Sequence, residues 1–141
     1  MYYFAFASNL NRKQMAERAP SAKPRFSATL PNYKLIFSGW SRNWRGAVAS
    51  IQQSRGDKVM GGIYEISEQD LARLVQFEGP DYTNVKVMVF RDTGEAVEAV
   101  TFTRKRQGEE GKPSPEYLSV IKQGYIDWDL TADSGDRNNR Y

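Results

Sequence analysis

Glu78 stands where a helix is expected to present an apolar side chain. Residues 68–78 predict a helix in which Leu71, Leu74 and Val75 form an apolar stripe facing the core. The next position of that stripe is Glu78. Burial disfavours the charged form of a carboxylate, and the negative end of the helix dipole disfavours it further. Both effects raise its pKa and make Glu78 a candidate general acid/base.

A simpler interpretation of Glu78 stays open. If the helix ends one residue earlier, Glu78 turns into solvent and Phe77 fills the core. Tyr82, four residues further on, can reach the same pocket as Glu78. By default, however, Tyr82 is only the first residue of a strand.

A second candidate feature is the opening stretch "YYFAFASNLN". An apolar strand over residues 2–7 changes abruptly into the small, polar residues Ala7, Ser8 and Asn9, and a helix is expected after them. Backbone N–H groups at the start of a helix lack internal partners and favour an anion. Many such junctions bind nothing, so this signal is weak alone. Together with Glu78 it suggests a pocket for a small substrate that carries a carboxylate and a proton to be moved.

The absent residue types restrict the chemistry. The chain of 141 residues has no Cys and no His. Disulfides, thiolate nucleophiles, histidine-based triads and the usual zinc sites are thereby excluded, and no metal or other cofactor is expected. Proton transfer in an enzyme of this composition falls to a carboxylate, a Lys, a Tyr or the substrate itself.

The charge balance does not favour nucleic acid as a partner. The net charge is only +3, with basic clusters at Arg42/Arg45 and at "RKR", 104–106. Such clusters are more often solvated than part of a nucleic-acid groove. Salt-sensitive retention on DNA or RNA, lost on changing Arg42, Arg45 and Lys105, would support that weaker hypothesis. No apolar run has the roughly 20 residues of a membrane span, and no signal peptide is evident, so a cytoplasmic protein without membrane contact is expected.

The elements that must position these residues read as an α+β domain. Asn9 is a possible cap for a helix over residues 10–18. "FSATL" and "YKLIF" are short strand candidates, 39–46 is a loop, and "AVASIQQ" and "KVMGGIYEI" are expected to form a hairpin about "SRGD".

The second half of the chain has clearer signals. Ser67 and Asp70 have capping-box spacing before the helix 68–78, which Gly79-Pro80 ends. A second hairpin is expected about "DTG", 92–94. Ser114 and Pro115 start a further helix with Gly124 as its stop. The predicted fold is a small mixed β-barrel or strongly curved sheet with flanking helices, over a single domain 1–128, followed by a polar, flexible tail, 129–141.

Several of these stretches resemble one known family, the γ-glutamylcyclotransferases. "YYFAFASNL" is similar to the family signature "YFAYGSNL", and "FEGPDY" to its catalytic Glu-Gly segment with a nearby Tyr. "WRGAVASIQQSRGDKVMGGIYEI" resembles the family's Trp-x-Gly loop, strand, "SPGD" turn and strand, and "PSPEYLSVIKQG" its C-terminal helix. The similarity runs in order over residues 2–128.

The resemblance implies a small mixed barrel and an enzyme that cyclises a γ-glutamyl amide to 5-oxoproline with release of the amine. The substrate's own α-nitrogen attacks its γ-carbonyl, so the protein supplies no nucleophile. Glu78 would move the proton from the α-nitrogen to the leaving nitrogen. Substrate-binding roles carry over to Phe6, Ala7, Ser8, Asn9, Leu10, Tyr82 and Phe102. A homodimer is possible.

Three positions depart from the family pattern. Its Tyr-Gly pair is Phe6-Ala7 here, and a pocket Tyr of the later hairpin corresponds to Phe102. Ala7 does not adopt a positive φ as freely as Gly. The substrate is therefore left open among glutathione, γ-glutamylamines and the biosynthetic intermediate of a γ-glutamyl deacylase. The alternative from another class is a non-catalytic small-molecule-binding protein on the same fold.

Overall fold

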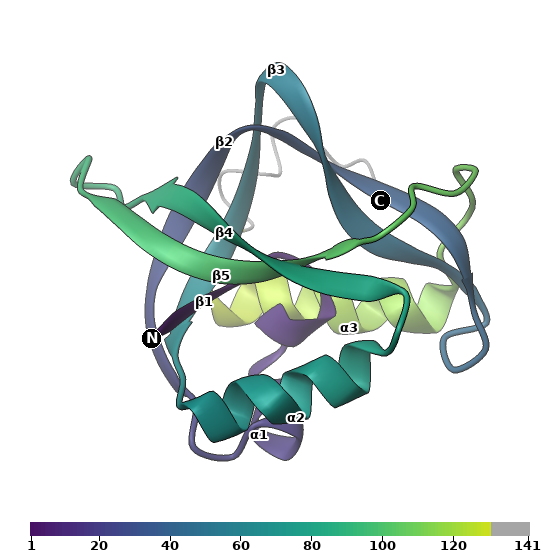
Figure 1. Ribbon diagram of the computed structural model, residues 1–141, viewed down its shortest axis with the longest axis horizontal. Coiled ribbons are helices and arrows are strands. Elements are labelled where there is room, and N and C mark those ends of the chain that lie inside the picture. Colours follow the sequence, from purple (N-terminus) through teal and green to yellow (C-terminus); the bar gives the residue numbers. More distant parts are fainter. Residues whose placement is uncertain (131–141) are drawn as a thin grey trace.

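The strands of the protein close into a small barrel that carries its helices on one side (Figure 1). The computed structural model describes residues 1–130. Along the chain its elements are β1 (Tyr2–Ala5), the 3-10 turn η1 (Ser8–Leu10), α1 (Arg12–Arg18), β2 (Lys23–Ser41), β3 (Gly46–Glu65), α2 (Glu68–Glu78), β4 (Tyr82–Phe90), β5 (Ala96–Arg104) and α3 (Pro115–Asp127).

The barrel is mixed, as the sequence predicts. Its strand order is β1-β3-β2-β4-β5. β1 pairs parallel with β5 and antiparallel with β3, while β2 pairs antiparallel with β3 and β4, and β4 antiparallel with β5. Closure places the end of β1 and the start of η1 beside elements that are distant in sequence, and this junction holds one side of the site described below.

The predicted hairpin about "SRGD" is wrong. β3 is one strand from Gly46 to Glu65, and it pairs with β2 along nearly its whole length, so the four short strand candidates are two long strands. An irregularity between Pro31 and Tyr33 faces residues 54–57, where the Gly56 amide donates to Asn32 Oδ1 at 3.0 Å. The turn residues therefore bend both strands together instead of reversing the chain. The reversal falls at 42–45, inside the predicted loop.

The predicted cap of the first helix is also wrong. Asn9 lies within η1, and Asn11 is the N-cap of α1, with its side chain accepting from the Gln14 amide at 3.0 Å. Two short helical segments thus replace the single helix expected over residues 10–18. The change matters because it releases the Asn9 side chain for other contacts.

The two later helices begin as the sequence predicts. Ser67 and Asp70 form a capping box at α2, and the Ser114 side chain accepts from the Tyr117 amide at α3. Gly124, however, does not stop α3. A Cβ there would lie 2.6 Å from Leu10 Cβ, so this glycine lets the middle of α3 pack directly on η1.

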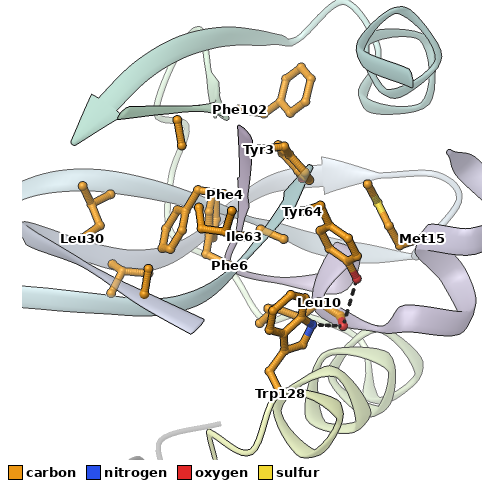
Figure 2. Packing of buried hydrophobic residues seen from close by; sticks show 14 of the residues in the cluster. Tyr3, Phe4, Phe6, Leu10, Met15, Leu30, Ile63, Tyr64, Phe102 and Trp128 are labelled. Carbon is orange, nitrogen blue, oxygen red and sulfur yellow. Dashed lines mark hydrogen bonds between the residues drawn. The ribbon is translucent and has the colours of Figure 1, made fainter. Parts of the chain in front are cut away.

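An aromatic layer of the core holds η1 in place (Figure 2). The rings of Tyr3 and Tyr64 stack at a centroid distance of 6.3 Å, and Tyr64 meets Trp128 edge-on at 5.2 Å. The Trp128 indole donates to the Leu10 carbonyl at 2.8 Å, and the Tyr64 hydroxyl donates to the Asn9 carbonyl at 2.9 Å. These bonds fix the backbone of η1 from its buried side.

The boundary of the predicted tail falls beside buried residues. Leu130 is buried in the core, and its amide donates to the Tyr125 carbonyl at 2.8 Å. The rest of the predicted tail, 131–141, lies outside the described residues. None of the helices within 1–130 has the length and apolar character needed to cross a bilayer.

Candidate active site

Glu78 is the last residue of α2, and its side chain is 17% exposed. The helix does not end early: the Gly79 amide still donates to the Val75 carbonyl, and Gly79 takes a φ of 88°. Leu74 is fully buried as predicted, but Val75 is 42% and Phe77 51% exposed. The helix is therefore rotated so that Glu78, and not Phe77, turns inward, and the placement of Val75 in the core is wrong.

Burial raises the pKa of Glu78 to about 7, because a charged carboxylate loses its hydration there. The Arg18 guanidinium and the hydrogen bond from Asn9 act in the opposite direction on this pKa. Arg18 Nη1 lies 3.9 Å from Glu78 Oε2, and Asn9 Nδ2 donates to the same oxygen at 3.4 Å. Both protonation states of Glu78 are thus populated near neutral pH, as proton transfer in both directions requires.

The Asn9 carboxamide has a fixed orientation. Its Oδ1 accepts from Gln14 Nε2 and from Arg18 Nη1, each at 3.1 Å, while its Nδ2 donates to the Tyr3 hydroxyl at 2.9 Å and to Glu78. Because two donors bind Oδ1 of Asn9, its Nδ2 must point toward the Glu78 carboxylate. Asn9 therefore orients Glu78 through a network built from η1, α1 and β1.

Replacing Arg18 by methionine should raise the pKa of Glu78 further. The substitution removes the nearby cation that favours the charged carboxylate, and a shift of about 1 pH unit is expected for a partner within about 4–6 Å. An NMR titration of the Glu78 carboxyl carbon measures it. Arg18→Lys keeps the charge and should shift the pKa less. An unchanged titration in Arg18→Met would show that Arg18 does not act on Glu78.

Two adjoining cavities meet at Glu78. A narrow pocket of about 40 Å³ lies against η1, and a wider cleft of about 410 Å³ opens beyond it. Both are lined by Ser8, Glu78, Tyr82 and Tyr117. The narrow pocket brings together nearly all the residues singled out in the sequence: Phe6, Ala7, Ser8, Asn9, Glu78, Tyr82 and Phe102.

Leu10 is the exception among these residues. It is fully buried in the core and does not line either cavity. Its carbonyl accepts from the Trp128 indole, so it anchors η1 from behind. Ala7 precedes η1 with a φ of −138°, a value open to any residue. This position therefore does not require the positive φ that favours glycine.

Two tyrosine hydroxyls that line the cavities both bond to the backbone of Ala49. Tyr82 donates to the Ala49 carbonyl at 2.8 Å, and the Ala49 amide donates to the Tyr117 hydroxyl at 2.9 Å. Burial raises the pKa of both tyrosines, so both hydroxyls stay protonated. Since Tyr117 accepts from Ala49, its own proton remains free to donate into the cavity.

Sequence reasoning missed Tyr117, Arg18 and Tyr3. No local signal marks them, since Tyr117 reads as an ordinary first-turn residue after the Ser114 cap. Phe102 is buried, and its ring meets that of Tyr3 edge-on at a centroid distance of 5.9 Å. Its side chain therefore makes this part of the narrow pocket apolar.

The arrangement combines three chemical elements. The backbone at η1 offers the Ser8 and Asn9 amides, which precede its first internal bond, from the Leu10 amide to the Ala7 carbonyl. Glu78 offers a proton acceptor, and Tyr117 a proton donor. Within residues 1–130 no three acidic side chains come close enough together to hold a metal ion.

Comparison with known proteins agrees with this fold. The family described as "Gamma-glutamyl cyclotransferase, AIG2-like" matches residues 3–126. The chain is 32% identical over 129 residues to the human gamma-glutamylcyclotransferase and 31% to the mouse protein, covering 86% of this chain and 68% of each relative. A solved structure named gamma-glutamyl cyclotransferase superposes with a TM-score of 0.90 at 28% identity, covering 100% of this chain and 90% of that one. The chain belongs to the gamma-glutamyl cyclotransferase, AIG2-like family and is an enzyme of the cyclotransferase type.

Proposed function

We propose that the protein cyclises a γ-glutamyl amide to 5-oxoproline and releases the amine, with Glu78 as the general acid/base. The observation that carries the proposal is the placement of Glu78 between the η1 backbone and an open cleft, with its pKa raised to about 7. A carboxylate of ordinary pKa is too weak a base to take a proton from an α-ammonium. The raised pKa of Glu78 lies closer to that of the ammonium, which makes Glu78 a stronger base.

The substrate is held at its α-carboxylate by the amides of Ser8 and Asn9. Glu78 then takes a proton from the α-nitrogen, which attacks the γ-carbonyl carbon and closes a five-membered ring. Tyr117 donates a hydrogen bond to the carbonyl oxygen as negative charge develops there. Glu78 passes its proton to the leaving nitrogen, and the bond between the γ-carbon and that nitrogen breaks. The ring nitrogen gives up its second proton to the released amine, so that 5-oxoproline and the protonated amine result.

This reaction suits a chain without Cys or His. The nucleophile and the carbonyl belong to the same molecule, so orientation supplies a large part of the rate. The protein needs only to hold the γ-glutamyl group in a folded conformation and to move one proton.

Ser8→Pro tests the role of the η1 amides. It removes one backbone donor and should raise KM by about 10- to 100-fold, the range for losing a hydrogen bond to a charged group. Ser8→Ala should change KM much less, since it keeps the amide. Circular dichroism and thermal unfolding provide the folding control for the proline variant. A large loss in Ser8→Ala with none in Ser8→Pro would assign the binding to the side chain instead.

The reaction itself is tested by measuring 5-oxoproline release from a panel of γ-glutamyl compounds. Release with a matched amount of free amine supports the proposal. A protein that binds these compounds and releases nothing is the non-catalytic binding protein that the sequence left as an alternative. The cytoplasm as the site of action remains a prediction.

A further inference from the structure

The cleft beyond Glu78 has features that the cyclisation itself does not use. The narrow pocket against η1 is about 40 Å³, while the cleft is about 410 Å³. If the proposed function holds, the α-carboxylate end of the substrate lies by η1 and the scissile nitrogen lies at Glu78. The leaving amine must then extend into the cleft, whose walls determine which amines fit.

Those walls carry three arginines, of which two have no anionic partner among the described residues. Arg18, Arg42 and Arg104 line the cleft, and Arg18 is already engaged with Asn9 and Glu78. Arg104 donates to the Arg106 carbonyl, and its guanidinium lies over the Tyr82 ring. In the described part of the chain neither Arg42 nor Arg104 forms an ion pair with a carboxylate. Among residues 1–130, the carboxylates on the walls are those of Glu78 and Asp81 alone, so the outer cleft favours an anion.

The same walls carry exposed aromatic side chains. Trp40 is 69% exposed and Phe77 51% exposed, although both are large and apolar. They line the cleft from different elements, Trp40 at the end of β2 and Phe77 in the last turn of α2. Trp44 instead packs on Tyr117 at 4.8 Å. Exposed aromatic surface beside a cleft gains most by packing against a planar or apolar group of a ligand.

We propose that Trp40, Phe77, Arg42 and Arg104 form a leaving-group subsite for an aromatic amino acid with a free carboxylate. The favoured substrates are accordingly γ-glutamyl derivatives of aromatic amino acids. The arginines bind the carboxylate of the leaving group, and the aromatic side chains pack against its ring. A cationic amine, by contrast, meets two guanidinium groups and is disfavoured.

The experiment compares kcat/KM for γ-glutamyl-L-phenylalanine with three analogues. Two of them each lack one feature, and the third lacks both features and adds a positive charge. The C-terminal amide of γ-glutamyl-L-phenylalanine lacks the carboxylate, γ-glutamyl-L-alanine lacks the ring, and ε-(γ-glutamyl)-L-lysine methyl ester carries a cation. The amide and the alanine compound should each be about 10-fold poorer, and the cationic compound poorer still.

Variants assign each preference to its residues. Arg42→Met should lower kcat/KM about 10-fold for the acid but leave the amide nearly unchanged. Trp40→Ala should lower it for the phenylalanine compound and not for the alanine compound. Arg55→Met and Met88→Ala, which change exposed residues outside the cleft, are the matched controls and should affect all four compounds equally little.

The outcomes separate this inference from the proposed function. Release of 5-oxoproline with equal or better use of the amide or the cationic compound overturns the subsite and leaves the cyclotransferase intact. If no compound releases 5-oxoproline, the proposed function fails, and calorimetric binding to the unmodified protein decides the subsite. Tighter binding of the phenylalanine acid than of its amide supports it, while equal binding or none overturns it.

Discussion

Glu78→Gln is expected to reduce kcat by at least about 100-fold on the best γ-glutamyl substrate. Glutamine keeps the size of the side chain and the hydrogen bond from Asn9 but cannot accept a proton, and general acid/base catalysis contributes about 10²–10⁴-fold. KM should change little, because the proposed carboxylate site is the η1 backbone. The measurement is the rate of 5-oxoproline release at saturating substrate.

The same variant should be more stable than the wild type at alkaline pH. The pKa of Glu78 is raised to about 7 in the folded protein, so the folded state holds its proton more tightly than the unfolded state does. Ionisation of Glu78 therefore destabilises the fold progressively as pH rises from about 4.5 to 7. The advantage of Glu78→Gln should be small below this window and reach about 3 kcal/mol above it.

Urea unfolding at pH 5 and pH 8 measures this difference. Glu98→Gln is the matched control, since Glu98 is an exposed carboxylate on β5 and its loss should change neither stability nor rate. If Glu78→Gln keeps near wild-type activity, Glu78 is not the proton carrier. If Glu78→Gln loses activity but is no more stable than the wild type at pH 8, the ionised Glu78 side chain does not destabilise the fold.

The second large effect is the pH dependence of the reaction. kcat/KM should fall about tenfold per pH unit below a midpoint near 7, and at pH 5 it should be about 100-fold below its plateau. Lowering the pH protonates Glu78 and removes the base, and kcat/KM therefore falls as the pH falls. In most enzymes a limb at this pH is assigned to histidine, but this chain contains none.

The profile is measured from pH 4.5 to 9, with the fold checked at each point and the ionisation of the free substrate titrated separately. The Arg18→Met variant should move the midpoint to higher pH, in step with the titration of Glu78 itself. Activity that stays flat down to pH 4.5 would mean that Glu78 is an ordinary carboxylate and would remove it from the mechanism.

The sequence predicted correctly those features that depend only on neighbouring residues, namely the helix caps and the β4–β5 hairpin. The capping box of Ser67 and Asp70 and the cap at Ser114 form within one turn of chain, so no distant contact is needed to select them. The hairpin of β4 and β5 and the end of α2 at Gly79 follow in the same way. The break in the apolar stripe at Glu78 was also visible, because a charged residue at a core position contradicts the helical period.

The predictions from sequence are wrong where contacts between distant segments outweigh the conformational preference of neighbouring residues. "SRGD" has the composition of a turn, yet β3 pairs with β2 on both sides of it. The chain therefore bends at these residues instead of reversing. Gly124 is typical of a helix stop, but it lies inside α3, where the close approach of Leu10 leaves no room for a Cβ. Val75 and Phe77 are exposed because the packing of α2 sets its rotation, which residue types alone do not fix.

The sequence by itself determined the class of fold, the family and the candidate carboxylate, since these depend on composition, order and spacing. The tertiary structure decided the surroundings that give this carboxylate its chemistry. Asn9 and Glu78 are 69 residues apart, and Tyr117 arrives from a third segment. A pKa depends on burial and on charges within a few ångströms. Those distances exist only once the barrel has closed and the helices have packed against it.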